Sequence, residues 1–389
     1  FHWAKFSTFN GNFADKDFLY HAVLIPFTFF KDIFFGAKAA AFIFTVLLFL
    51  GFYLILKRYS NKSILPFFLS GFFLSGMFLE TVSSPRPMTF VILINLLAIH
   101  LLINKRHWWV FFTAVFYSLI HVTSPLIIVY AVIIEAVRHF DKKEFDSKNI
   151  LFAFLGVLAG FLCHPNFPNN FIVFYLNSIL VPLYTIKTGV LELGAEFFPL
   201  NTREYLLSYP VVIIGIISIL YIAISRMPKP RFETKVFLTL GMVFFVLSFT
   251  CRRYLSHGYL IMLTAFSCYA SDCFDSWKKT AKSAVVLAAI LFLMLVINSF
   301  NAIRYNALVA RVINGHYEAA GRWMEKNIPE GELIFHANWS DSQYFIGLNP
   351  KDDYFVTLDP VYMYNKNPDL YKIYRDVSFG KAKDPYTVL

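Results

Sequence analysis

The sequence predicts an all-α polytopic membrane protein, with about ten transmembrane helices and a small C-terminal extracytoplasmic α/β domain. Hydrophobic residues make up 57% of the chain and charged residues only 15%, and the mean hydropathy is +0.56. Soluble domains average about 25% charged residues. The 46 Phe residues also suit lipid-facing and interfacial surfaces. The composition therefore favours a membrane protein over a soluble domain.

Apolar runs that approach the roughly 20 residues needed to cross a bilayer recur along the chain. Shorter runs can still cross inside a bundle of helices. We expect a membrane helix in each of the runs 36–56, 63–80, 87–104, 107–122, 124–138, 149–163, 204–225, 236–250, 256–272 and 283–300.

The loops between these runs alternate in basic charge. One set holds Lys57, Arg58, Lys62, Lys105, Arg106, Arg138, Lys142, Lys143, Lys148, Arg226, Lys229, Arg231, Lys235, Lys278, Lys279 and Lys282. The other set holds Arg86, Lys187, Arg203, Arg252 and Arg253. Basic loops stay in the cytoplasm, so the second set is expected outside. The net charge of +10 therefore indicates topology and not nucleic-acid binding.

Three regions follow from this pattern. Residues 1–35 are expected to form the first extracytoplasmic loop with interfacial helices. Residues 36–300 form the transmembrane domain, including an outer loop at 164–203. Residues 301–389 form the extracytoplasmic α/β domain, which is expected to be truncated. Because the chain starts at Phe1 within a loop-like stretch, one more membrane helix is expected upstream.

The polar N-terminal stretch carries a compact group of ionisable side chains. Asp15 and Asp17 flank Lys16, and His21 follows Asp17 by one helical turn. Carboxylates and a histidine within reach of one another can act as general acid and base. The alternative interpretation is a solvated helix start.

Arginines lie on the outer side, where the charge pattern disfavours them, at Arg86, Arg252 and Arg253. A guanidinium group matches phosphate oxygens, so these residues are expected to bind an anion. The alternatives are contact with lipid headgroups and an ion pair between Arg86 and Glu80.

The outer loop and the tail have further signals. Phe171 to Leu183 predicts a surface or re-entrant helix and not another crossing. Glu196 is an isolated acid that suits either a substrate or metal contact or a helix entry. His121 and His164 end apolar runs, which favours packed or interfacial histidines over ligands.

The tail predicts one amphipathic helix and two strands. The strands are expected at 332–336 and 354–358. The helix, stopped by Pro329, is expected to share one face among Ala320, Trp323, Met324 and Ile328.

Several kinds of site are absent from the sequence. The four cysteines show no metal-ligand spacing. There is no phosphate loop, no dinucleotide fingerprint and no zinc-protease motif. No cofactor and no metal site is therefore predicted, although a divalent metal stays open. The energy for a transfer reaction must come from an activated substrate, and a lipid-linked donor is the natural choice for an outward-facing enzyme.

Short segments in a fixed order resemble the type C glycosyltransferase superfamily, in a bacterial branch similar to the dolichyl-phosphate-mannose protein mannosyltransferases. The segments are 14–21 (ADKDFLYH), 164–170 (HPNFPNN), 195–199 (AEFFP), 252–254 (RRY), 338–341 (NWSD), 347–350 (GLNP) and 358–360 (LDP). The resemblance covers nearly the whole chain as architecture. It implies a membrane enzyme that moves a sugar from a polyprenyl-phosphate donor to an acceptor hydroxyl with inversion.

The resemblance also implies roles for individual residues. Asp17 is the expected general base, with Asp15 as alternative or helper. Arg252, Arg253 and Arg86 are expected to bind the donor phosphate, together with Lys16. The candidate acceptor or substrate contacts are His21, Glu80, His164 and Glu196. The site and the C-terminal domain are expected on the periplasmic side of the bacterial inner membrane.

Two classes of alternative function stay open. A multi-pass transporter or a lipid-linked glycan flippase predicts internal repeats and charges inside the membrane, and neither pattern is clear in this sequence. A polysaccharide polymerase or ligase favours a large outer loop between late helices. For the transferase, the acceptor can be a lipid, a protein hydroxyl or a cell-envelope glycan.

Overall fold

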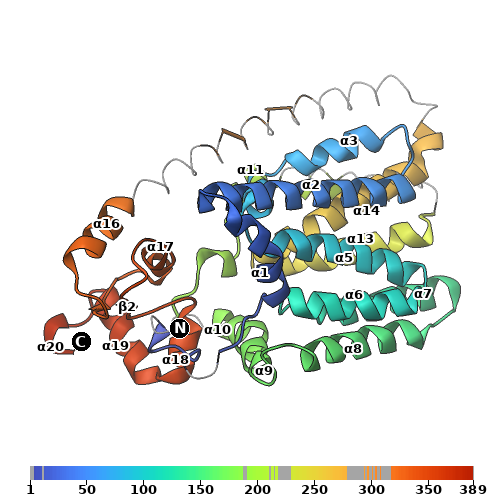
Figure 1. Cartoon of the computed structure of the whole chain (residues 1–389). Coiled ribbons are helices and arrows are strands. Elements are labelled where there is room, and N and C mark those ends of the chain that lie inside the picture. The colour runs from blue at the N-terminus through green and yellow to red at the C-terminus, as the bar shows by residue number, and fades with distance from the viewer. Residues whose placement is uncertain are drawn as a thin grey trace. The chain divides into compact units, whose positions relative to one another are not determined.

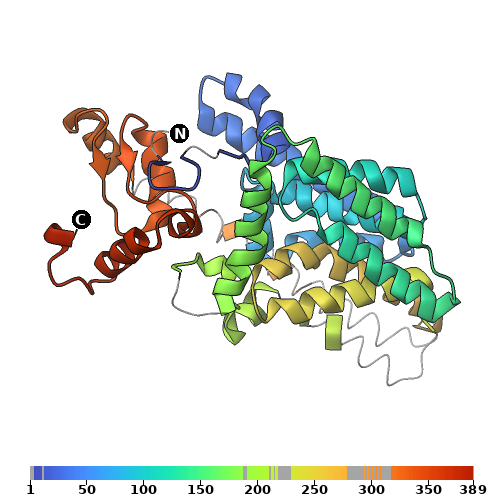
Figure 2. The ribbon, with the colours of Figure 1, turned by 90° about the horizontal axis from the view of Figure 1, so that it is seen from below.

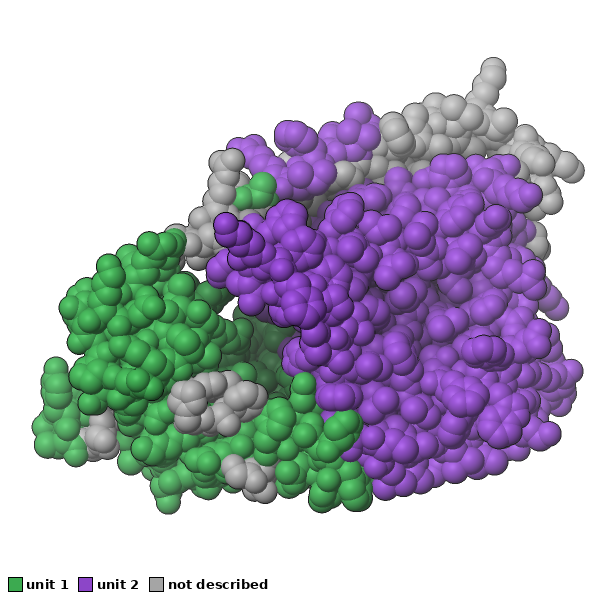
Figure 3. All heavy atoms as spheres, viewed as in Figure 1, with its two compact units in different colours: residues 1–16, 165–198, 307–389 green, residues 17–164, 199–306 purple. Residues whose placement is uncertain are grey.

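The computed structural model describes residues 4–10, 13–186, 191–209, 229–277 and 317–388, with isolated positions within 212–217 and 293–307. The chain forms two compact units (Figure 3). Unit 1 comprises residues 1–16, 165–198 and 307–389, and unit 2 comprises residues 17–164 and 199–306. Neither unit is continuous in sequence, in contrast to the predicted regions 1–35, 36–300 and 301–389.

Unit 2 is helical throughout its described part (Figure 1). Its elements are α1 (Phe18–Leu24), η2 (Ile25–Phe29), α2 (Ile33–Tyr59), α3 (Leu65–Ser70), η3 (Gly71–Phe73), α4 (Gly76–Ser83), α5 (Met88–Ile103), α6 (His107–Ile120), α7 (Leu126–Lys142), α8 (Ser147–Leu162), α11 (Thr202–Ser208), α13 (Phe232–Ser248) and α14 (Arg253–Trp277). These helices follow the predicted apolar runs. The run 283–300 and most of 204–225 lie largely outside the described residues.

The prediction of about ten transmembrane helices is wrong for the described part of the chain. One helix there, α2 with 27 residues, is long and apolar enough to cross a membrane. The pair α4 and α5 passes the same test only when joined, and it is bent by 104°. The polytopic fold class is therefore corrected to a helical bundle with one such span, or two if the bent pair counts as one.

The physical reason is helix length. Within unit 2, α6 has 14 residues, α5 and α8 have 16, and α7 and α13 have 17. At about 1.5 Å of rise per residue, these helices are shorter than the roughly 30 Å hydrocarbon core. The apolar runs in the sequence are therefore longer than the regular helices that form within them.

Glycines allow α6 and α8 to pack closely (Figure 1). A Cβ atom at Gly156 would lie 2.7 Å from the Ala114 Cβ, and one at Gly160 would lie 2.6 Å from the Ser118 Cβ. Both pairs are spaced by four residues, so one small-residue stripe on each helix forms the contact. The residue numbers increase together, which makes the two helices parallel.

The α13–α14 pair is antiparallel. Gly241 packs against Met262, and Gly258 packs against Phe244. The two helices run alongside each other in the view of Figure 2. This hairpin places Arg231, just before α13, next to Asp272 near the end of α14.

Contacts gather several basic loops at one end of unit 2. Arg138 donates to the carbonyl oxygens of Leu102 and Ile103 at the end of α5. Lys235 on α13 pairs with Asp141 near the end of α7. The basic loops that the structure describes around residues 102–106, 138–148 and 229–235 therefore meet at the same end of the bundle.

Unit 1 combines short helices with a two-stranded sheet. Its elements are α9 (Asn169–Phe174), the π-helix η4 (Tyr175–Leu180), α10 (Val181–Ile186), η5 (Ala195–Phe197), α16 (Glu318–Asn327), β1 (Leu333–Ile334), η7 (Trp339–Asp341), α17 (Ser342–Leu348), β2 (Asp353–Tyr354), α18 (Pro360–Lys366), α19 (Pro368–Ser378) and α20 (Pro385–Val388). The two strands are parallel, with Leu333 opposite Asp353.

Unit 1 confirms some of the expected elements and corrects others. A helix over Phe171 to Leu183 is confirmed, because α9, η4 and α10 cover it. The predicted strands pair, but each has only two residues. The tail helix is confirmed as α16, in which Gly321 and Met324 are buried and Trp323 is 61% exposed.

Candidate functional site

Asp17 stands at the N-cap of α1 and is the first residue of unit 2. Its side chain is 8% exposed, and its Oδ1 lies 3.8 Å from Nε2 of His121. His121 follows the last residue of α6 and takes an extended conformation there. A helix start and a helix end thus bring an acid and a histidine together across about a hundred residues of chain.

Hydrogen bonds determine the tautomer of His121. Its Nδ1 accepts the backbone N–H of Thr123 at 3.2 Å and lies 2.8 Å from the Thr123 Oγ1. An N–H donor requires an acceptor, so Nδ1 carries no proton and the ring proton is on Nε2. The Nε2–H therefore faces the Asp17 carboxylate. The 3.8 Å separation is an ion-pair distance and is longer than a hydrogen bond.

The Tyr117 hydroxyl continues the series of polar groups that begins with Asp17, His121 and Thr123. The Tyr117 hydroxyl lies 3.1 Å from the Thr123 Oγ1. Tyr117 is fully buried in α6. The Asp17 carboxylate, the His121 imidazole, the Thr123 hydroxyl and the Tyr117 phenol form a series that leads from the start of α1 into the core.

Tyr20 anchors α1 in the core of unit 2. Its ring packs edge-on against Phe44 of α2 and Phe90 of α5. It belongs to a buried cluster that also contains Tyr117 and Ile120 of α6. Burial, and after it the negative charge of Asp17, raises the pKa of the Tyr20 phenol. The packing thereby fixes where the Asp17 side chain stands relative to α6.

The other members of the N-terminal group have surroundings of their own. The Asp15 backbone N–H donates to Oδ1 of Asn166, and both residues belong to unit 1. Lys16 is half-buried and is the last residue of that segment. His21 is exposed, and its ring lies 5.8 Å from that of Tyr20. His121, which the sequence did not place in the predicted acid/base group, therefore joins Asp17 as a candidate member of it.

The candidate phosphate-binding arginines are located in unit 2. Arg252 and Arg253 are half-buried at the start of α14. Arg86 is exposed in the turn between α4 and α5. Glu80 is exposed on α4, where its backbone oxygen accepts the Ser84 hydroxyl at 2.7 Å.

The remaining candidates divide between the units. His164 ends unit 2, is 5% exposed and packs edge-on against Phe18 of α1 at 5.8 Å between ring centroids. This contact ties the end of α8 to the start of α1. Glu196 lies in η5 of unit 1 and is half-buried. Among the described residues, no group of three or more His, Cys, Asp or Glu side chains has the arrangement of a metal site.

Sequence reasoning undervalued His121, because a histidine that ends an apolar run is usually packed. One signal was available: the charge pattern put the start of the first helix and the end of the 107–122 run on the same side. Comparison with models of known protein families finds no match to this chain, and no curated protein matches it either.

Proposed function

We propose that this protein is a membrane-associated glycosyltransferase. It moves a sugar from a polyprenyl-phosphate donor to an acceptor hydroxyl at the outer face of the bacterial inner membrane, and Asp17 is the general base. The observation that carries the proposal is the buried Asp17 carboxylate held against a histidine whose tautomer directs its proton at that carboxylate.

The reaction uses the proton-accepting capacity of Asp17. The acceptor hydroxyl attacks the anomeric carbon and gives its proton to the carboxylate. A new carbon–oxygen bond forms while the bond from the anomeric carbon to the lipid phosphate breaks. Attack opposite the leaving group inverts the anomeric centre. Glycosidases use a second acid to protonate a poor leaving group, whereas a phosphate leaves as a stable anion.

His121 has a positioning role in this scheme. Its Nε2–H orients the Asp17 carboxylate, and it stabilises the charged form that must be present before proton transfer. Catalytic hydrogen bonds in enzymes without substrate are often long, and they shorten when substrate binds. The separation of 3.8 Å between His121 Nε2 and Asp17 Oδ1 fits this behaviour. Thr123 keeps the imidazole in the productive tautomer through its backbone N–H.

Cationic side chains are available for the donor phosphate. Arg252 directly precedes α14 and Arg253 is its first residue, and both lie within the same unit as Asp17. Guanidinium groups stabilise charge that develops on phosphate oxygens as the bond to the sugar breaks. In this proposal they take the leaving group and Asp17 takes the proton.

The surface of unit 2 supports a membrane location. Large apolar side chains are exposed along α2, α6 and α8. Examples are Phe34 at 70%, Phe42 at 71%, Trp108 at 66%, Trp109 at 66% and Phe154 at 50%. Extended apolar surface of this kind marks contact with a membrane or a partner protein. Among the helices that the structure describes, α2 is both long and apolar enough to cross the bilayer as a single helix.

The test measures sugar transfer by the purified full-length protein from labelled polyprenyl-phosphate sugars. The Asp17→Asn variant is expected to lose a factor of about 10²–10⁴ in rate. The matched control is Asp32→Asn, which makes the same chemical change at the exposed N-cap of α2, where Asn caps as well as Asp. Unchanged transfer by Asp17→Asn would overturn the proposal, and movement of the lipid without covalent transfer would indicate a transporter.

A further inference from the structure

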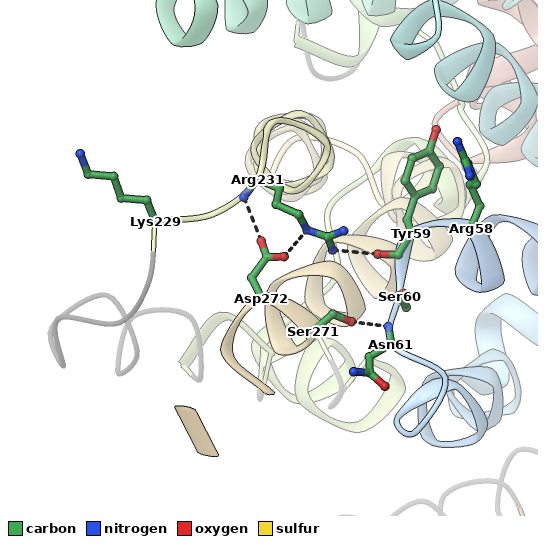
Figure 4. Close-up of a pocket in the computed structure, with 8 residues that line it drawn as sticks. All are labelled: Arg58, Tyr59, Ser60, Asn61, Lys229, Arg231, Ser271 and Asp272. Atoms are coloured by element: carbon green, nitrogen blue, oxygen red, sulfur yellow. Dashed lines mark hydrogen bonds and ion pairs between the residues drawn. The ribbon is translucent and has the colours of Figure 1, made fainter. Parts of the chain in front are cut away.

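A cavity of about 430 Å³ opens in unit 2 where the ends of α2 and α14 meet the start of α13 (Figure 4). Its lining includes the cationic side chains of Arg58, Lys229 and Arg231 and the carboxylate of Asp272. The volume is within the range of about 300–1,000 Å³ for small-molecule sites. None of these residues belongs to the group around Asp17.

The cavity and the Asp17 group lie at opposite ends of the helices. Arg231 begins α13 beside the loops that carry the excess of basic residues, because Lys235 pairs with Asp141 at the end of α7. His121 stands at the far end of α6, whose first residue, His107, bonds to Asp146 before α8. The cavity therefore has no part in the proposed transfer reaction.

Arg231 is held rigidly in the cavity wall. Its Nε donates to Asp272 Oδ1, and its Nη2 donates to the Tyr59 carbonyl oxygen at 2.9 Å. Figure 4 shows the guanidinium between these two acceptors. Both carboxylate oxygens of Asp272 are occupied, since Oδ2 accepts the Arg231 backbone N–H at 3.0 Å and the Thr234 hydroxyl at 2.7 Å. A cation fixed in this way loses little entropy when it binds a ligand.

Arg58 and Lys229 stand on either side of this fixed pair (Figure 4). Both are exposed, and neither forms an ion pair with a residue that the structure describes. The Asp272 charge is already shared with Arg231, so this carboxylate does not pair with the two flanking side chains. The flexible stem of Lys229 lets its ammonium group swing over the opening, whereas the planar guanidinium of Arg58 matches two phosphate oxygens.

The wall between the cations is also fixed by polar contacts. The Asn61 backbone N–H donates to the Ser271 hydroxyl at 2.7 Å, which fastens the turn after α2 to α14. The Ser267 hydroxyl donates to the Ser60 hydroxyl at 2.7 Å. The opening is therefore built on the ends of three packed helices and does not depend on a single side chain.

We propose that this cavity binds a phosphate monoester or diester through Arg58, Lys229 and Arg231. The chemistry needs a compact anion with several acceptor oxygens, because the fixed guanidinium and the two flanking cations all present donors. Such a phosphate is available from an anionic lipid headgroup at the membrane surface or from a soluble phosphate compound. The inference is independent of the proposed sugar transfer.

The experiment compares two charge-matched double variants of the full-length protein. Arg58→Gln with Lys229→Gln removes the flanking cations. Arg106→Gln with Lys148→Gln removes the same two charges from exposed positions in other loops of the same unit. All four positions are exposed, so both proteins are expected to fold, which equal melting temperatures without ligand will verify. Arg231 is left intact because it supports Asp272.

Two binding measurements distinguish the sources of phosphate. The first titrates inorganic phosphate against the protein in detergent and follows the melting temperature. The second measures association of the protein in detergent-free nanodiscs of neutral lipid with added vesicles of phosphatidylcholine, with or without phosphatidic acid. The pocket variant is expected to bind at least ~10-fold more weakly than the wild type in one of the two measurements, and the control by less than ~2-fold.

Each outcome decides the proposal. A loss confined to the pocket variant with inorganic phosphate supports a soluble phosphate ligand, and a loss confined to it with phosphatidic acid vesicles supports a lipid headgroup. Equal losses in the two double variants overturn the proposal, since they show an unspecific effect of surface charge. Absence of binding by the wild type in both measurements overturns it as well.

Discussion

At the residue scale, the proposed chemistry depends on how a small set of side chains positions one proton. The Thr123 backbone N–H directs the His121 proton away from Nδ1 and toward Asp17. Tyr20, packed in the core, holds the helix that begins at Asp17. The proposed catalytic carboxylate and its supporting histidine thus come from helix ends, where side chains are least constrained by their own helix and need such support.

Removing the His121 imidazole is expected to slow sugar transfer without preventing binding. In the proposed reaction the His121–Asp17 contact tightens to a hydrogen bond when substrate binds. A hydrogen bond to a charged group contributes about 1.5–3 kcal/mol, so the His121→Ala variant should lower kcat by about 10- to 150-fold. KM should change little, because His121 acts through Asp17. Steady-state kinetics on the purified protein measure both constants.

Two further variants separate positioning from folding. His121→Gln keeps an N–H donor and should recover part of the lost kcat. His139→Ala removes an exposed histidine on α7 and should leave kcat unchanged. If His121→Ala keeps the wild-type kcat with an unchanged melting temperature, the positioning role is incorrect.

His336 in unit 1 makes stability depend on pH. Burial lowers the pKa of its imidazole below the usual value, with hydrogen bonds to the backbone acting in the opposite direction. Nδ1 lies 2.9 Å from the Asn338 carbonyl oxygen and donates to it, while the buried Nε2 has no hydrogen-bond partner among the described residues. Protonation would place a charged imidazolium at a buried position, and backbone hydrogen bonds offset only part of that cost.

The sign of the effect follows from the lowered pKa. The stabilising contribution is complete above the unfolded-state pKa of about 6.5 and is lost as the pH falls from there through the lower folded-state value. The melting temperature of the wild type should therefore drop between pH 7.5 and pH 5 by more than that of His336→Gln. An equal drop in both proteins would assign the pH dependence to other groups.

At the scale of elements, close helix contacts depend on residues without bulk. The α6–α8 interface has small side chains at matched positions one turn apart, so the two backbones approach within the space of a methyl group. Such small-residue stripes are common where helices pack within membranes. The adjacent network around Glu135, Arg138 and Asn149 is fully buried and links α5, α7 and α8 by hydrogen bonds.

One methyl group at this interface should destabilise the protein. In Gly160→Ala, the new Cβ would lie 2.6 Å from the Ser118 Cβ and 2.9 Å from the Val115 carbonyl oxygen, so a helix must shift. Overpacking of this kind costs about 1–3 kcal/mol. Thermal or denaturant unfolding of the variant measures the loss.

The control is the same substitution at a glycine with free space. Gly347 lies in α17, and a Cβ there meets nothing within 4 Å. Alanine favours helix over glycine by about 0.5–1 kcal/mol, so Gly347→Ala should be neutral or slightly stabilising. If the two variants unfold alike, the close α6–α8 contact does not contribute to stability.

At the scale of the whole molecule, unit 2 combines exposed apolar surface with clustered positive charge. The described helices of unit 2 present Phe, Trp and Leu side chains outward, and the basic loops gather at one end of the same helices. In the proposed membrane location, lipid contact would account for the first property and the positive-inside rule for the second. Both therefore support the same orientation of α2 relative to a membrane.

Labelling from the two sides tests that orientation. In a background with the four native cysteines replaced, Thr28→Cys and Lys62→Cys place single thiols beyond the two ends of α2, at exposed positions. A membrane-impermeant maleimide should label the Thr28→Cys protein in intact spheroplasts. The Lys62→Cys protein should react only after permeabilisation. Reversed labelling, or equal labelling of both in intact cells, would contradict the orientation.

Local sequence patterns predicted the positions of most described helices correctly. The apolar runs coincide with α5, α6, α7, α8 and α13 because hydrophobicity and helix propensity act over a few turns. The predicted number of membrane spans was wrong. Helix length depends on where turns such as Ser84–Pro87 and His121–Pro125 interrupt the chain. The hydropathy pattern identified the apolar segments but did not predict where each helix ends.

For the candidate site, sequence alone was sufficient to identify Asp17 as an acid at a helix start and to group the basic loops at one end. Charge and helix-start signals are local, so they can be read without the fold. Tertiary structure was needed to pair Asp17 with His121 and to bring Arg58, Lys229 and Arg231 around one cavity. Asp17 and His121, and likewise Arg58 and the Lys229–Arg231 segment, are separated by about a hundred residues or more. Only the packing of whole helices determines which of their ends meet.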